Sequence, residues 1–148
     1  VNSIIDLNDN QGRVFLLHIY LGRPSLPLYC VLARHGWLFD FKVSNFQIFG
    51  REDNLDMYRG MQIAKEGDVR IISSARDIGN MAAGFITGYY GLTWEFTRYI
   101  FDLYQGNWDH IEEEGQSSQN AQKYGFEKGQ DANLQLRLIK ELKRLIHD

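Results

Sequence analysis

The stretch Ala75-Arg76-Asp77-Ile78-Gly79-Asn80-Met81-Ala82-Ala83-Gly84-Phe85-Ile86-Thr87-Gly88 decides the fold of this chain. It is rich in small residues, and Gly84 and Gly88 lie one helical turn apart. The pattern predicts a helix. Each glycine lowers helix propensity by about 1 kcal/mol, but this spacing lets another stretch of backbone approach closely. The pattern changes here from strand-like to helical. We therefore predict a strand-rich part over residues 1–72 and a helix-rich part over residues 73–148.

The residues well before this stretch read as strands. In residues 37–43 the odd positions are apolar and Asp40 and Lys42 stand between them, which is the period-two pattern of a half-buried antiparallel strand. We predict a small antiparallel sheet within residues 13–43, built from residues 14–20, 28–34 and 36–43.

The elements in the middle of the chain are shorter. Residues 69–72 are predicted to form either a short strand or an extended lead-in to the next helix, and Asp53 to be the N-cap of a helix that runs to Gln62. Thr93 is the predicted N-cap of a helix, and a further short helix is predicted over residues 118–126. The helix after Thr93 has a buried side at spacings of three and four residues, made of Trp94, Thr97, Ile100, Phe101 and Tyr104.

The clearest helix covers residues 132–147. Six leucines and isoleucines recur there at helical spacing: Leu134, Leu138, Ile139, Leu142, Leu145 and Ile146. We predict that this stripe packs on the core of the domain, the alternative being a partner helix or a dimer seam. Basic residues surround the stripe and would suit a local contact with nucleic acid or an acidic partner. The whole pattern predicts an α+β fold, a small N-terminal antiparallel sheet followed by a mainly helical C-terminal half in a single domain.

Composition sets bounds on function. The 148 residues are the length of one domain, and a hydrophobic content of 44% is enough for a sizeable core. The net charge of −3 argues against a global positive field for nucleic acid, and no apolar run is long enough to span a membrane. The lone Cys30 excludes an internal disulfide, a cysteine zinc site and the zinc deaminases. The histidines lack metal-ligand spacing, so we predict neither a metal site nor a cofactor.

Candidate catalytic residues lie on the helix predicted after residue 93. Glu95, Arg98 and Asp102 follow one another at spacings of three and four residues, opposite the buried side. A solvated salt-bridge ladder would explain them fully. In a cleft, Arg98 would instead fix the two carboxylates or bind a phosphate. His35, in a predicted turn, is a further candidate for acid–base catalysis.

Candidate binding residues lie at the start of the small-residue helix, within residues 73–80. Free backbone N–H groups at a helix start bind anions, and Arg76 would add a positive charge. We therefore predict substrate-binding roles for Arg76, Asp77 and Asn80, although capping of the helix by Ser74 or Asp77 also explains these polar residues. Because the Gly-x-x-x-x-Gly-Lys pattern is missing, a nucleotide P-loop is rejected.

A family resemblance covers residues 75–129. It is carried by residues 75–85, by Gly88-x-x-Gly91-Leu92-x-Trp94, by Arg98 with Phe101-Asp102, and by Glu114-Gly115-x-Ser117-Ser118-Gln119-Asn120-Ala121-Gln122 with Gly125 and Gly129. These motifs resemble the C-terminal modules of Rhs-type bacterial polymorphic toxins. They are similar to the class named polymorphic toxin type 44, which is regarded as a predicted ribonuclease.

The resemblance implies an antibacterial effector domain, and the first expectation for its activity is a metal-independent ribonuclease. Such a domain would be delivered into a target bacterial cell as the C-terminal part of a larger protein, and a cognate immunity protein would neutralise it. With RNA as the substrate, Arg76 or Arg98 would hold the phosphate, and a carboxylate or His35 would activate the ribose 2′-hydroxyl. Two alternatives stay open. One is a cell-envelope glycan hydrolase that uses Glu95 and Asp102 as acid and base, and the other is a non-enzymatic immunity or interaction module.

Overall fold

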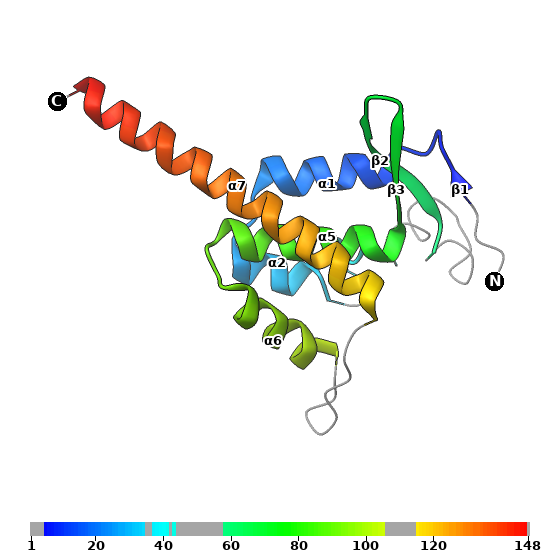
Figure 1. Ribbon diagram of the computed structural model, residues 1–148. Coiled ribbons are helices and arrows are strands. Elements are labelled where there is room, and N and C mark those ends of the chain that lie inside the picture. The colour runs from blue at the N-terminus through cyan, green and yellow to red at the C-terminus, as the bar shows by residue number, and fades with distance from the viewer. Residues whose placement is uncertain (1–4, 35–36, 42, 44–57, 106–114, 148) are drawn as a thin grey trace.

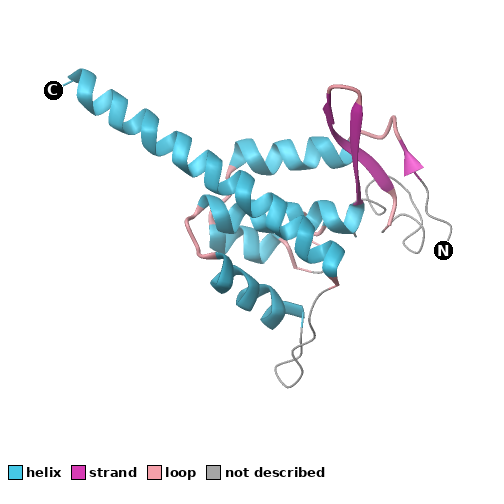
Figure 2. Ribbon diagram, in the orientation of Figure 1, coloured by secondary structure: helices cyan, strands magenta, loops and turns pink. Residues whose placement is uncertain are grey.

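A computed structural model describes residues 5–34, 37–41, 43, 58–105 and 115–147 of the chain. Within them the elements are, in order, β1 (Ile5–Asp6), α1 (Gln11–Gly22), α2 (Leu26–Leu32), β2 (Gly60–Glu66), β3 (Val69–Ser74), α5 (Ala75–Tyr89), α6 (Trp94–Gln105) and α7 (Gln116–His147). In Figure 1, α5 lies among the other helices, and Figure 2 shows the small sheet at one end of the molecule. The fold is α+β with a mainly helical C-terminal half, as the sequence predicts.

Helix α5 packs on α7 with backbone directly against backbone. A Cβ atom added to Gly84 would overlap the carbonyl oxygen of Gln122, and one added to Gly125 would overlap that of Met81. Gly129 approaches the backbone of α5 in the same way. Because only hydrogen fits at these positions, the close approach that the glycine spacing allows does occur, and the facing glycines come from α7.

Side-chain caps fix where two of the helices begin. The Oγ atom of Ser74 accepts the backbone N–H of Asp77 at 3.1 Å and caps α5. The Oγ1 atom of Thr93 accepts the backbone N–H of Phe96 at 3.2 Å, so the predicted N-cap of α6 is confirmed. Each cap satisfies a donor that the first turn of a helix leaves free.

The sheet has the order β1-β2-β3, with β1 parallel to β2 and β2 antiparallel to β3. The strand predicted over residues 69–72 is confirmed as part of β3. Gly67 turns the β2–β3 hairpin at a φ of 58°, which glycine adopts without steric cost. Because Ser74 both ends β3 and caps α5, the hairpin fixes the position of the first turn of α5.

The first two predicted strands are wrong, since both stretches are mostly helical: residues 14–20 and 28–34. On α1 the buried residues are Gly12, Leu16 and Ile19, at spacings of three and four. A helical face is therefore present in what reads as a continuous apolar run. Pro27 lies in the first turn of α2, where its missing N–H costs no hydrogen bond. The sheet therefore comes from parts of the chain other than residues 13–43. It is mixed and not purely antiparallel.

The third predicted strand, residues 36–43, is not formed by its described residues. The backbone N–H groups of Trp37, Asp40 and Val43 each donate to the carbonyl oxygen three residues earlier, which makes a series of turns. The apolar residues after Trp37 that are described at odd positions are buried, as the alternation predicts, but Asp40 is buried as well. Phe41 and Val43 are helical, so the alternation here reflects side-chain burial and marks no strand among the described residues.

Two more helices differ from the prediction. The helix expected to run to Gln62 ends in a strand instead, because Gln62 belongs to β2, and its part before residue 58 lies outside the described residues. The helices predicted over residues 118–126 and 132–147 are one helix, α7. The helix continues through Gly129 because this glycine faces α5 and does not terminate the helix.

The core lies between α1, α2, the hairpin, α5 and the first half of α7. Its fully buried members include Ile19, Met61 and Ile78, from α1, β2 and α5. The ring of Tyr20 stacks on that of Phe85 with centroids 4.2 Å apart, which joins α1 to α5. Among the described residues, no helix is long and apolar enough to cross a membrane.

The prediction that the end of α7 packs on the core is wrong. Six side chains, called the C-terminal stripe from here on, are between 50% and 76% exposed: Leu134, Leu138, Ile139, Leu142, Leu145 and Ile146. In Figure 1 this end of α7 extends beyond the other elements. The stripe is amphipathic as the sequence indicates, but the domain does not cover it.

Candidate functional site

A cavity of about 200 Å³ opens between α2, residues 37–41, α5, α6 and α7. Its wall is mainly apolar and carries aromatic side chains, among them Tyr29, Phe39, Phe41 and Phe101. Tyr29 and Phe39 stack with ring centroids 5.6 Å apart, which holds the turns of residues 37–41 against α2. A mostly apolar cavity of this kind suits a flat organic group.

Polar side chains interrupt this apolar wall: Asp40, Arg76, Asn80, Thr87 and Gln122. The hydroxyl of Thr87 donates to the carbonyl oxygen of Gly84 at 2.8 Å, so its hydrogen is used inside α5. The Nδ2 atom of Asn80 is buried and has no hydrogen-bond partner among the described residues. Because an unsatisfied buried donor costs about 1–3 kcal/mol, this amide favours a ligand that accepts a hydrogen bond.

A second hollow lies at the first turns of α5 and α7, and Arg76 lines both this hollow and the cavity. Asp77 lines the hollow as well, and its Oδ2 atom accepts a hydrogen bond from Ser117 Oγ at 2.9 Å. The Nη1 atom of Arg76 lies 3.5 Å from the hydroxyl oxygen of Tyr58, at the outer limit of a hydrogen bond. Arg76 is therefore a weakly held cation where the two spaces meet.

On α6, Arg98 donates to Asp102 Oδ1 and to Gln122 Oε1. The side chains of Arg98 and Asp102 are only 15% and 22% exposed, so the pair lies partly inside the protein and ties α6 to α7. Glu95 is exposed and lines neither the cavity nor the hollow. Of the three residues of the predicted polar wall, Arg98 and Asp102 therefore form an ion pair, and Glu95 takes no part in it.

The structure brings only part of the predicted site together. Arg76 and Asn80 line the cavity and Asp77 the adjoining hollow, whereas Arg98 and Asp102 are connected to the cavity through Gln122. His35 lies outside the described residues.

Three polar residues of the cavity wall, Asp40, Thr87 and Gln122, were not among the predicted site residues. Asp40 was assigned to the outer face of a strand that does not form, and its polar position in an apolar run was the only signal. Gln122 belongs to the resemblance, at the end of the stretch Ser117–Gln122, and this position could have marked it.

Cys30 also lines the cavity. Burial raises the pKa of its thiol above the ordinary value. The thiol therefore stays protonated at neutral pH, and since the thiolate is the nucleophile, Cys30 does not have the character of a catalytic cysteine.

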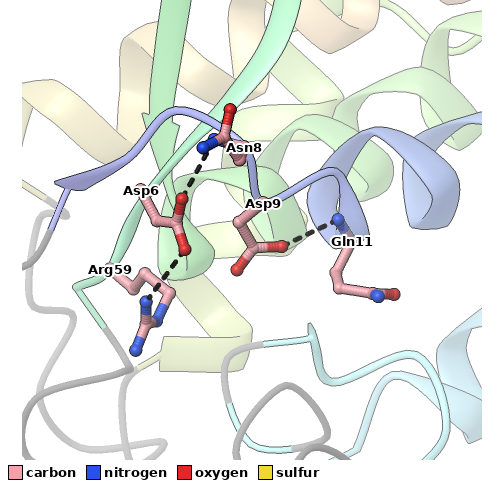
Figure 3. A network of polar contacts seen from close by, with 5 residues as sticks. All are labelled: Asp6, Asn8, Asp9, Gln11 and Arg59. Atoms are coloured by element: carbon pink, nitrogen blue, oxygen red, sulfur yellow. Dashed lines mark hydrogen bonds and ion pairs between the residues drawn. The ribbon is translucent and has the colours of Figure 1, made fainter.

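Another polar cluster lies where β1 leads into α1 (Figure 3). The Oδ1 atom of Asp9 accepts the backbone N–H of Gln11 at 2.9 Å, and that of Asp6 accepts the N–H of Asn8 at 3.0 Å. Arg59 Nη1 lies 3.9 Å from Asp6 Oδ2. These contacts shape a turn and connect it to the residue before β2. Among the described residues, no group of three or more His, Cys, Asp or Glu is arranged to hold a metal ion.

Comparison with known proteins returned no match: neither a protein-family model nor a curated protein nor a solved structure matches this chain.

Proposed function

We propose that the chain is the effector domain of a bacterial competition system and acts as a ribonuclease at the cavity beside Arg76. The proposal rests on where the segments that resemble polymorphic toxins meet. Arg76 and Asp77 from α5, and Ser117 and Gln122 from α7, border the cavity or its adjoining hollow. Four glycines of the resemblance, Gly84, Gly88, Gly125 and Gly129, serve the contact between α5 and α7, whereas its polar residues lie at the edge of that contact.

The chemistry of the cavity suits one nucleotide of an RNA strand. The guanidinium of Arg76 offers paired N–H donors that match a phosphate. The aromatic wall, with Tyr29 and Phe39, offers a surface on which a base stacks. The Nδ2 atom of Asn80, which has no partner within the described ranges, then donates to an oxygen of the base or the sugar.

Within the described residues, Asp40 supplies the carboxylate of the cavity wall, and we assign it the role of general base. It removes the proton of the ribose 2′-hydroxyl, and the 2′-oxygen forms a bond to the adjacent phosphorus. The bond from phosphorus to the 5′-oxygen breaks, and solvent protonates this leaving oxygen. The products are a 2′,3′-cyclic phosphate and a 5′-hydroxyl end. Arg76 stabilises the negative charge that gathers on the phosphoryl oxygens.

Cleavage of single-stranded RNA by the purified chain tests the proposal. Arg76→Ala and Asp40→Asn should each lower the rate about 100-fold or more, with the thermal unfolding transition retained. Arg70→Ala, which removes an exposed cation from β3, is the matched control and should cleave at the full rate. Intact RNA after incubation with the unmodified chain, or full activity of Arg76→Ala, contradicts the proposal.

Expression in two bacterial compartments separates this function from the alternatives. Toxicity in the cytoplasm supports the ribonuclease, toxicity only after export supports a glycan hydrolase, and harmlessness in both supports an immunity or interaction module. In the proposed setting the chain enters a target cell as the C-terminal part of a larger protein. A cognate immunity protein neutralises it there.

A further inference from the structure

The C-terminal stripe belongs to a helix segment whose two faces are sharply different. From Arg137 to Ile146, 3.6 residues per turn place every leucine and isoleucine within a sector of about 120° and every charged residue in the remainder. The charged face holds four basic residues and Glu141. The carboxylate of Glu141 already pairs with Arg144 at 3.1 Å. The segment is thus a basic amphipathic helix on a chain whose net charge is −3.

We infer that this segment, residues 137–146 of α7, binds the surface of an anionic phospholipid membrane and lies in the headgroup region. An apolar face of leucine and isoleucine with a lysine- and arginine-rich polar face is the pattern of a helix that lies on a membrane. The helix needs no folding on the lipid, because its first half is already fixed against α5. Binding therefore does not have to repay the cost of ordering a peptide.

The charge distribution favours a lipid surface over a second copy of the chain. A second copy that covered the stripe would leave the basic faces of both helices on the outside, without a partner of opposite charge. An anionic surface attracts them instead, and the Debye length of about 8–10 Å lets it act across the width of a helix. The end of α7 lies about 15 Å beyond Arg137, so the attraction operates away from the acidic remainder of the chain.

The composition of the stripe favours lipid over a protein groove. Contacts that dominate protein interfaces are enriched in tryptophan, tyrosine and arginine, and leucine is under-represented among them. The stripe consists of leucine and isoleucine alone. Its basic residues also lie mostly on the opposite face of the helix, where a groove that holds the stripe would not reach them.

Co-sedimentation of the full chain with phospholipid vesicles tests the inference. The chain should bind vesicles of phosphatidylcholine mixed with phosphatidylglycerol at least about ten-fold more strongly than vesicles of phosphatidylcholine alone, and added salt should weaken the binding. The double variants Leu138→Gln/Leu142→Gln and Lys140→Gln/Lys143→Gln should each lower the binding about ten-fold. Leu21→Gln on α1 and Lys65→Gln/Arg70→Gln on the hairpin remove similarly exposed groups elsewhere and should bind like the unmodified chain.

Several results would overturn the inference: no binding to the mixed vesicles, equal binding to both kinds, or undiminished binding of the leucine variant. A dimer that dissociates in Leu138→Gln/Leu142→Gln, without any binding to vesicles, would assign the stripe to a second copy. Because these side chains are exposed, the variants should keep the helical circular dichroism and the unfolding temperature of the parent. They should also cleave RNA at the parent rate, so this test and that of the ribonuclease stand apart.

Discussion

Ser117 at the start of α7 donates a hydrogen bond to Asp77 at the start of α5, with 2.9 Å between Oγ and Oδ2. The two residues are 40 positions apart in the sequence, and their contact joins the first turns of the two helices that form the centre of the fold. The same carboxylate borders the hollow beside Arg76. The position of the candidate site therefore depends on how these helix ends are held together.

We expect Ser117→Ala to lower the free energy of unfolding by about 0.5–1 kcal/mol, because one hydrogen bond to a charged acceptor is lost near the surface. Asp77→Ala should cost more, since it also removes a negative charge from the N-terminal turn of α5. Urea unfolding of both single variants and the double variant measures the coupling between them. Strictly additive effects would mean that the contact contributes nothing to stability.

Gly84→Ala should be strongly destabilising, at least about 3 kcal/mol, because the new methyl group meets the carbonyl of Gln122 and the helices have to separate. Gly79→Ala in the same helix is the matched control, since its Cβ atom meets nothing within 4 Å. That change should raise the free energy of unfolding by about 0.5–1 kcal/mol through helix propensity. Similar urea midpoints for the two variants would contradict the backbone contact.

Arg98→Ala should lower the free energy of unfolding by about 2 kcal/mol, because Asp102 and Gln122 both lose a partly buried charged partner. Glu95→Ala, on the exposed side of α6, should change it by less than about 0.5 kcal/mol. Thermal unfolding measures both. An Arg98→Ala protein of parental stability that no longer cleaves RNA would instead make this arginine part of the reaction.

Tyr20→Phe should leave stability at neutral pH unchanged or raise it by up to about 1 kcal/mol. Its hydroxyl is buried without a hydrogen-bond partner among the described residues, and phenylalanine keeps the stacking on Phe85. Burial, with a smaller contribution from Tyr124, raises the pKa of Tyr20 above its ordinary value of about 10. Since the hydroxyl of Tyr20 then ionises near pH 10 only in the unfolded chain, this residue makes the free energy of unfolding fall as the pH rises above that value. This fall should be smaller in Tyr20→Phe than in the parent. If the free energy of unfolding falls equally with pH in both proteins, Tyr20 does not contribute to the alkaline loss of stability.

The α-helical half of the fold was predictable because its signals are local. The glycine spacing of α5, the cap at Thr93 and the amphipathic pattern of α7 each specify a helix within a few residues. The run before Gly22 carries no such signal. Apolar residues occupy most positions there, so the period that distinguishes strand from helix is hidden, and contacts with α5 and β2 decide which positions are buried.

The candidate site was predictable only where a polar residue stands next to a helix start. Arg76 and Asp77 have that position, and both border the cavity or its hollow. The position of Asp40 in the cavity wall depends on turns that are buried because Tyr29 and Phe39 pack together. No spacing in the sequence indicates this packing. The exposure of the C-terminal stripe was equally hidden, because an amphipathic pattern is the same whether its apolar face is covered by the domain or by something else.

Because α7 runs unbroken from the cavity wall to its exposed tip, it acts mechanically as a strut. At 1.5 Å per residue, Gln122 and Leu142 are about 30 Å apart along one stiff axis. A membrane or partner that binds the tip therefore sets the distance and the tilt of the cavity relative to itself. The helix between the tip and the cavity is continuous and cannot bend to change them. A rotation of the tip about the helix axis would also move Gly125 and Gly129. These glycines lie directly against the backbone of α5, so the rotation would displace α5 as well.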